Sequence, residues 1–159
     1  MGQGANYWTT VETAVGRFAV VGDSEVVTEV VLPNVLMGDL GRPTPSEPVR
    51  LAAEQIAEYV EGERLDFDIP MRSGGTSFQE QVWAALDEIP YGEVRSYAWV
   101  ADAVGRPHGP RAVGQALGRN PIPILRACHR VVATDGIGGY GGGIGLKRSL
   151  LEIEGVEFS

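Results

Sequence analysis

The chain has 159 residues, 43% hydrophobic and 21% charged, which suits one ordinary domain or a small domain fused to a second unit. No apolar run approaches the roughly 18 residues of a membrane span, and the first residues lack a secretory signal, so we expect a cytoplasmic protein without a membrane partner. One cysteine, two histidines and a net charge of -8 argue against a disulfide, a zinc site and a uniformly basic surface, and we expect no metal and no cofactor.

The first part of the chain predicts a small antiparallel β-sheet covered by one helix. Apolar residues recur at helical spacing over 49–60, after a proline-rich loop at 39–48 in which Ser46 is a candidate helix cap. Apolar residues and aspartates alternate over 65–69, a period of two that indicates one more strand with a solvated face. β-Branched and aromatic residues predict the opening strands at 7–12, 16–21 and 25–32.

A polar, flexible segment then marks a domain boundary. Thr76 with Gln79, or Ser77 with Glu80, can form a capping box for a helix whose bulky apolar stripe indicates core packing. The predicted division is an N-terminal α/β domain at 1–72, a linker at 73–76 and a second domain at 77–159.

Two short helices joined by a glycine-containing turn follow in the second domain. The first is expected at 96–104, and the second at 110–117, where a proline suits the first helical position. This is helix-turn-helix spacing, although many helical hairpins share it. Small residues leave part of the second helix smooth, so its backbone could approach a DNA groove while Arg111 and Gln115 project; close helix packing explains the smooth surface equally well.

The basic residues are concentrated in this second domain. The chain is strongly acidic up to Thr76, so that half should face away from DNA. Between residues 95 and 130, six arginines are opposed by Asp102 alone, which is a local basic footprint suited to a nucleic-acid partner. These arginines are Arg95, Arg106, Arg111, Arg119, Arg126 and Arg130.

The only cysteine, Cys128, lies in an electropositive stretch after a rigid segment at 120–125 that contains two prolines. A free thiol has a pKa of about 8.5, so a nucleophilic cysteine needs a base or positive surroundings to become a thiolate near neutral pH. The histidine that follows is such a base. We expect Cys128 on an extended strand, where neighbours point to opposite faces, so His129 needs a bridging water or a bend to reach it.

A glycine-rich loop at 134–145 follows, interrupted by Tyr140. It contains no phosphate-binding pattern, so it is interpreted as either disordered or the wall of a pocket for a planar ligand. The last helix, expected at 146–155, carries Glu152 and Glu154. One of these carboxylates could orient His129.

Seven motifs occur in one order: Pro90-Tyr91-Gly92-Glu93, Ser96-Tyr97, Arg111-Ala112-Val113-Gly114, Asn120-Pro121-Ile122-Pro123-Ile124, Cys128-His129-Arg130-Val131-Val132, Gly139-Tyr140, and Lys147 with Leu150-Leu151-Glu152-Ile153-Glu154. With these motifs the sequence resembles the O6-alkylguanine-DNA alkyltransferases, also called methylated-DNA-protein-cysteine methyltransferases. The resemblance covers roughly 78–154. It implies an α/β (α+β) fold, in which a small ribonuclease-H-like β-sheet with a helix precedes a mostly helical domain with a helix-turn-helix and the active-site cysteine.

The resemblance also implies a suicidal DNA-repair reaction, in which an alkyl group moves from O6 of guanine in double-stranded DNA onto the protein. By resemblance, Cys128 is the nucleophile, His129 takes its proton through a water, and Glu154 orients His129. Asn120 braces the turn between the recognition helix and the active-site strand. The product is a thioether, which thiol exchange does not reverse, so one molecule should repair one lesion.

The guanine pocket is likewise implied by the resemblance. Tyr140 and Leu117 line it, and the backbone N–H of Gly141 donates to O6. The carbonyls of Cys128 and Val131 accept from the exocyclic amine, and these contacts select guanine. O4-alkylthymine is left open as a second substrate.

The same resemblance places the second helix of the helix-turn-helix in the minor groove, which presents few sequence-specific features. Arg111 would replace the extruded base in the stack, and Tyr97 would donate toward guanine N3 and crowd the 3′ phosphate. The implied DNA contacts are Ser96, Tyr97, Arg111, Ala112, Gly114, Gln115 and Arg119.

One feature departs from the family pattern. The family usually has proline before the cysteine and an aliphatic residue before that, whereas this chain has Arg126-Ala127. The loss of proline frees the backbone beside the nucleophile, and Arg126 places a charge where the family is apolar. We therefore expect the rate, or the range of alkyl groups accepted, to differ.

Three other functions were weighed against alkyl transfer by a monomer acting on nucleoid DNA. Non-catalytic lesion-binding relatives typically carry tryptophan where this chain has Cys128. A helix-turn-helix regulator would leave the cysteine, the glycine loop and Glu154 without a purpose. A cysteine hydrolase would have no use for the arginine-rich helix.

Overall fold

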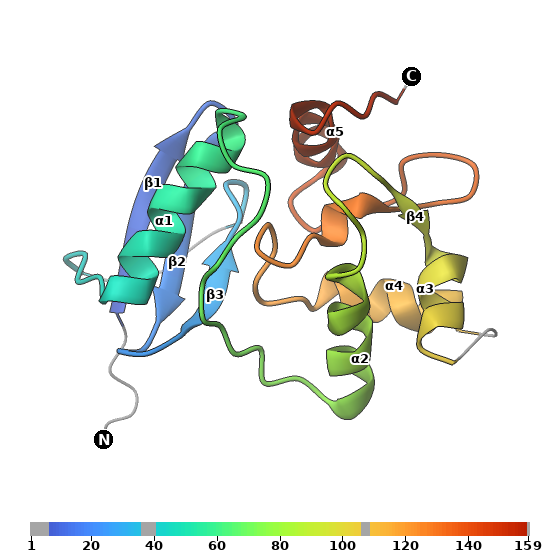
Figure 1. Cartoon of the computed structure of the whole chain (residues 1–159), viewed down its shortest axis with the longest axis horizontal. Coiled ribbons are helices and arrows are strands. Elements are labelled where there is room, and N and C mark those ends of the chain that lie inside the picture. The colour runs from blue at the N-terminus through green and yellow to red at the C-terminus, as the bar shows by residue number, and fades with distance from the viewer. Residues whose placement is uncertain (1–6, 36–40, 106–108, 159) are drawn as a thin grey trace. The chain divides into compact units, whose positions relative to one another are not determined.

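The structure is a computed structural model of the chain, and it describes residues 7–35, 41–105 and 109–158 (Figure 1). The predicted loop at 39–48 lies partly outside these ranges, and the basic residue Arg106 lies wholly outside them. Within the described ranges, no helix is both long enough and apolar enough to cross a membrane.

The chain forms two compact units. The first comprises Met1–Ser73 with Pro121–Leu125, and the second comprises Gly74–Asn120 with Arg126–Ser159. The short segment 121–125 joins the first unit because the N–H of Val30 donates to the carbonyl of Pro121 at 2.9 Å. The predicted division into an N-terminal domain at 1–72 and a second domain at 77–159 stays a prediction.

The first unit is an antiparallel sheet of strands β1 (Tyr7–Thr13), β2 (Gly16–Gly22) and β3 (Val27–Val31), with helix α1 (Glu47–Val60). The strands follow one another in chain order, and α1 runs along the sheet (Figure 1). Phe18, Val20 and Ile56 are fully buried in its core. The predicted helix, three opening strands and mixed α/β class are confirmed, while the ribonuclease-H-like layout stays a prediction.

The predicted strand at 65–69 is wrong. The N–H of Asp68 donates to Gln55 Oε1 on α1 at 3.3 Å instead of to a neighbouring strand. Backbone pairing begins only at Pro70, whose carbonyl accepts from the N–H of Val27 at 2.9 Å. A side-chain acceptor has therefore taken a backbone donor that a strand would have used.

The second unit contains α2 (Ser77–Leu86), β4 (Arg95–Ser96), α3 (Tyr97–Ala103), α4 (Pro110–Gly118), the 3₁₀ turn η2 (Cys128–Arg130), β5 (Val131–Val132) and α5 (Ile144–Ile153). Helices α3 and α4 confirm the two predicted helices of the helix-turn-helix. The indole N–H of Trp83 donates to the carbonyl of Ala116 at 2.8 Å and so fastens α2 to α4. Strands β4 and β5 pair in parallel, and α5 begins and ends two residues earlier than expected.

Local capping signals set two of the helix starts. Thr76 Oγ1 accepts from the N–H of Gln79 at 3.1 Å while Gln79 Oε1 accepts from the N–H of Thr76 at 3.0 Å, which is the predicted capping box. Ser96 caps α3 by accepting from the N–H of Trp99. Ser46 occupies the predicted N-cap position of α1, but its hydroxyl donates to the Asp23 carbonyl, so its side chain caps no N–H of the helix.

Candidate active site

Cys128 opens a 3₁₀ turn and not the predicted extended strand. The N–H of Cys128 donates to the carbonyl of Arg126 at 2.8 Å, and the N–H of Arg130 donates to the carbonyl of Ala127 at 3.0 Å. These local bonds use backbone groups that a strand would offer to a neighbour. The turn places the Cys128 side chain among the buried residues of the helical core, where it is 8% exposed.

His129 and Glu154 form a fully buried pair. His129 Nε2 lies 2.8 Å from Glu154 Oε2, and both side chains have 0% exposure. Burial alone would raise the pKa of Glu154, but hydrogen bonds from His129, Arg130 and the N–H of Gly92 lower it from 4.5 to about 2. Burial lowers the pKa of His129, although Glu154 acts in the opposite direction. Near neutral pH the site therefore holds a carboxylate and a neutral imidazole.

Arg130 fixes the carboxylate from the other side. Its Nε lies 2.9 Å from Glu154 Oε1 and its Nη2 lies 3.1 Å from Oε2. Its Nη1 also donates to the carbonyl of Ile89 at 2.7 Å, and its guanidinium lies 5.8 Å from the ring centre of Tyr91. Glu154 thus receives donors from three directions, which sets the orientation of both carboxylate oxygens.

The Cys128 thiol is protonated near neutral pH. Burial raises its pKa, while Asn120, the positive charge of Lys147 and Tyr140 act to lower it. Asn120 Nδ2 also donates to the carbonyl of Arg126 at 3.0 Å, so it bridges the segment that leads to the cysteine. A thiol in this setting needs a base before it can attack.

Lys147 is a buried cation near the thiol that the sequence reasoning did not select as a site residue. It is 1% exposed, and its Nζ donates to the carbonyls of Val131 at 2.7 Å and Gly139 at 3.0 Å. Burial lowers its pKa to about 8, so it is mostly charged at pH 7 and faces the thiol electrostatically. The available signal was its position seven residues before Glu154, which puts both side chains on one face of α5.

Helices α3 and α4 form an open depression on the surface of the second unit. It has a volume of about 490 Å³ and is lined by Tyr97, Pro110, Arg111, Gly114 and Gln115. Arg111 and Gln115 are exposed, and a Cβ at Gly114 would lie 3.9 Å from the Tyr97 ring. Of the small residues of α4, Ala112 is exposed and Gly114 lies at this depression, while Ala116 is buried in the helical core.

The glycine-rich loop comes close to Tyr97 on its inner side. A Cβ added at Gly138 would lie 2.8 Å from the Tyr97 hydroxyl and 3.1 Å from the backbone N of Ala133, and Gly138 has a φ of +78°. No other residue fits such a position without strain. Tyr140 is partly buried against the helical core, whereas Gly141 is exposed with open space beside it.

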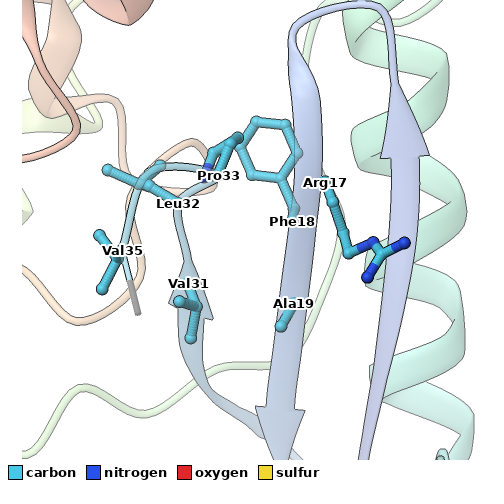
Figure 2. A pocket seen from close by; sticks show the side chains of 7 residues that line it. All are labelled: Arg17, Phe18, Ala19, Val31, Leu32, Pro33 and Val35. Carbon is cyan, nitrogen blue, oxygen red and sulfur yellow. The ribbon is translucent and has the colours of Figure 1, made fainter. Parts of the chain in front are cut away.

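A separate small pocket lies beside strands β2 and β3 of the first unit (Figure 2). It has a volume of about 170 Å³, and Arg17 is its one charged lining residue. Because the lining holds neither a nucleophile nor a carboxylate, we assign it no chemistry. Among the described residues, no three His, Cys, Asp or Glu side chains gather closely enough to hold a metal ion.

Comparison with known proteins decides the family. The family model of the 6-O-methylguanine DNA methyltransferase DNA-binding domain matches residues 77–156. The methylated-DNA–protein-cysteine methyltransferase of Mycobacterium tuberculosis is 41% identical over 151 residues, which cover 93% of this chain and 92% of that protein. The chain belongs to this methyltransferase family. The constitutive methyltransferase of Bacillus subtilis is 39% identical over 96% of this chain and 98% of its own length.

Solved structures of methyltransferases share the fold. The crystal structure of Mycobacterium tuberculosis OGT in complex with DNA superposes with a TM-score of 0.85, at 41% identity, over 93% of this chain and 92% of that one. The O6-methylguanine-DNA methyltransferase of Pyrococcus kodakaraensis superposes with a TM-score of 0.72, at 28% identity, over 96% of this chain and 100% of that one. The similarity therefore extends over both units.

The residues predicted for the methyltransferase site fall into two groups. Asn120 and Tyr140 contact the buried Cys128 thiol, and His129, the next residue in the chain, forms its buried pair with Glu154. Other predicted residues lie on or near the open face of α4, where Ala112 and Arg119 are also exposed, while Leu117 and Val131 are buried. Of the two glutamates that could have oriented His129, Glu152 is exposed and Glu154 is the partner.

Proposed function

We propose that this protein repairs DNA by direct reversal, taking a methyl or larger alkyl group from O6 of guanine onto Cys128 in a single turnover. The observation that carries the proposal is the sole cysteine beside a buried His129–Glu154 pair, in a chain related over most of its length to methylated-DNA–protein-cysteine methyltransferases. The non-catalytic lesion-binding alternative is not favoured, because the chain retains the cysteine that accepts the group. O4-alkylthymine is a further candidate substrate.

The protonation states of Glu154 and His129 support this chemistry. Because Glu154 is ionised, His129 Nε2 donates to it, and the lone pair of the neutral imidazole is then on Nδ1. We assign His129 the role of accepting the Cys128 proton through a water and Glu154 the role of fixing the tautomer. Asn120 and the charge of Lys147 stabilise the thiolate that results.

The transfer is a displacement at the alkyl carbon. The thiolate sulfur forms a bond to that carbon as the bond from carbon to O6 breaks, and the proton taken from the thiol returns to the guanine, which leaves neutral. The thioether has no thiol-exchange route back, so each molecule acts once. The raised pKa of the free thiol keeps the residue protonated until the substrate and the base are in place.

We assign DNA binding to the exposed face of α4 and the start of α3. Arg111 would fill the stack left by the extruded guanine, and Tyr97 would contact the guanine and its 3′ phosphate. The α4 backbone can approach a minor groove closely at Ala112 and Gly114, where the side chains of its outer surface are small. The other assigned contacts are Ser96, Ala112, Gly114, Gln115 and Arg119.

The guanine pocket is assigned to the glycine loop and the segment after the cysteine. Tyr140 and Leu117 would line it, Gly141 would donate to O6, and the carbonyls of Cys128 and Val131 would accept from the exocyclic amine. Lys147 supports this assignment because it already holds the Val131 carbonyl. A carbonyl has two lone pairs, so it can accept from both groups. We infer a monomer that acts in the cytoplasm on nucleoid DNA.

Intact-mass spectrometry tests the proposal. The protein is incubated with excess duplex DNA carrying O6-methylguanine, beside a lesion-free duplex and a Cys128→Ser control. A gain of one methylene, about 14 Da, capped at one per molecule and absent from both controls, is the expected result. Binding of the lesion duplex without a mass gain would refute the transfer reaction and restore the lesion-binding alternative.

A further inference from the structure

Ala127 is the centre of a tight turn immediately before the nucleophile. Its φ of -81° and ψ of 66° are those of an inverse γ-turn, and the N–H of Cys128 closes this turn on the Arg126 carbonyl at 2.8 Å. The 3₁₀ turn that carries the thiol begins at the next residue. The position of the thiol therefore depends on where the Arg126 carbonyl is held.

The Arg126 carbonyl accepts hydrogen bonds from two groups of the site. It accepts the N–H of Cys128 and, at 3.0 Å, Nδ2 of Asn120. Asn120 also lowers the pKa of Cys128 through a side-chain hydrogen bond. One carbonyl thus sets both the backbone of the nucleophile and the orientation of the amide that stabilises its thiolate.

The side chain of Arg126 is anchored to α2 by two carboxylates. Its Nη1 lies 3.9 Å from Glu80 Oε1, and its Nη2 lies 3.8 Å from Asp87 Oδ2. The arginine side chain is only 19% exposed, and Glu80 is itself held by the N–H of Gly75 at 2.7 Å. Both contacts are long ion pairs rather than hydrogen bonds, and Nη1 is buried without a hydrogen-bond partner among the described residues, so the guanidinium is held mainly by the charges of two carboxylates near opposite ends of α2.

We infer that Arg126 is a positioning residue for the alkyl transfer: Glu80 and Asp87 hold its side chain on α2, and its carbonyl thereby fixes Cys128 and Asn120. The inference rests on the proposed function. In this chain the ion pairs of Arg126 restrain the backbone turn at Ala127. A proline at position 127 would restrain the same turn through its ring. Loss of these ion pairs lets the γ-turn open. The thiol then moves, and the Asn120 contact that favours the thiolate weakens.

The geometry of position 127 provides a matched rescue. A φ of -81° is close to the value that proline imposes, and within the described ranges the N–H of Ala127 donates no hydrogen bond that proline would remove. Arg126 forms an isolated β-bridge, a position typical of the extended backbone that a residue before proline prefers. Ala127→Pro should therefore lock the turn without Arg126.

The test is the single-turnover rate of methyl transfer at saturating O6-methylguanine duplex, measured from pH 6 to pH 9 for the full chain. Arg126→Met should lower the rate at pH 7 roughly tenfold and move the midpoint of the pH–rate profile upward, with the duplex affinity unchanged. The double variant Arg126→Met/Ala127→Pro should recover most of the rate. Removing the anchors by Glu80→Gln/Asp87→Asn should reproduce the slow phenotype, while the exposed neighbour change Glu88→Gln should not.

A wild-type rate and pH midpoint in both Arg126→Met and Glu80→Gln/Asp87→Asn would overturn the inference. So would a loss confined to duplex affinity, or a double variant as slow as Arg126→Met. These outcomes all require transfer by the wild type. Absence of any transfer by the wild type would instead refute the proposed function.

Discussion

The replacement Glu154→Gln tests the buried network that supports His129. Glutamine keeps the shape of the side chain but carries the neutral charge of a protonated carboxyl group. Since the pKa of Glu154 falls from 4.5 to about 2 on folding, the folded protein prefers the ionised form by about 3 kcal/mol. Removal of one partner from a buried ion pair with Arg130 costs about 3 to 5 kcal/mol by general experience. The pKa shift and the buried ion pair both predict that Glu154→Gln lowers the free energy of unfolding at pH 7 by about 3 kcal/mol or slightly more.

Urea unfolding at pH 7, followed by tryptophan fluorescence, measures this loss. For a urea dependence of about 2 kcal/mol per molar, the midpoint should fall by about 1.5 M without a change in slope. Glu152→Gln is the matched control, because Glu152 lies on the same helix and is exposed, so it should shift the free energy by less than about 0.5 kcal/mol.

The choice of pH follows from the direction of the pKa shift. The folded pKa of Glu154 is lowered, so its stabilisation is complete above pH 4.5 and is lost as the pH falls toward about 2. At pH 7 the whole effect is present. A loss of less than about 1 kcal/mol in Glu154→Gln would refute the reasoning, because the donors around the carboxylate would then not depend on its charge.

Three further predictions concern the thiol, the core and the DNA face. Lys147→Met should slow the reaction of Cys128 with iodoacetamide at pH 7 about tenfold, because the ammonium, charged below its pKa of about 8, lowers the pKa of the thiol; an unchanged rate would show that the charge is ineffective. Trp83→Phe removes the hydrogen bond to Ala116 and should cost at least about 1 kcal/mol in urea unfolding, and an unchanged midpoint would contradict this. Arg119→Ala should reduce the slope of log affinity for duplex DNA against log salt concentration by about one, measured by fluorescence anisotropy. An unchanged slope would show that Arg119 contacts no phosphate.

The sequence by itself determined the elements whose signals are local. The capping box at Thr76 and the proline that starts α4 each act within one helical turn, so these helix starts could be located before any tertiary contact was known. The ordered motifs around Cys128 were equally local. They identified the family, and they predict Cys128 as the nucleophile with His129 as its base.

Tertiary structure decided whatever depends on partners distant in the chain. The strand expected at 65–69 was lost because Gln55 accepts the N–H of Asp68, and no alternation pattern reports such a competitor. The residue pattern alone left Glu152 and Glu154 both open; the family resemblance favoured Glu154, and the burial of Glu154 beside His129 is what pairs it with the imidazole.

The environment of the nucleophile shows the same division. Adjacent basic residues predicted an electropositive cysteine. In the structure the thiol is buried and its pKa is raised, and the cation that acts to lower this pKa is Lys147 on α5. The charge of Arg126 beside Cys128 could be predicted from the sequence. Its ion pairs with the two carboxylates of α2 could not. Residue types are local, whereas burial and ion pairing are properties of the folded chain, and these set the chemistry of the site.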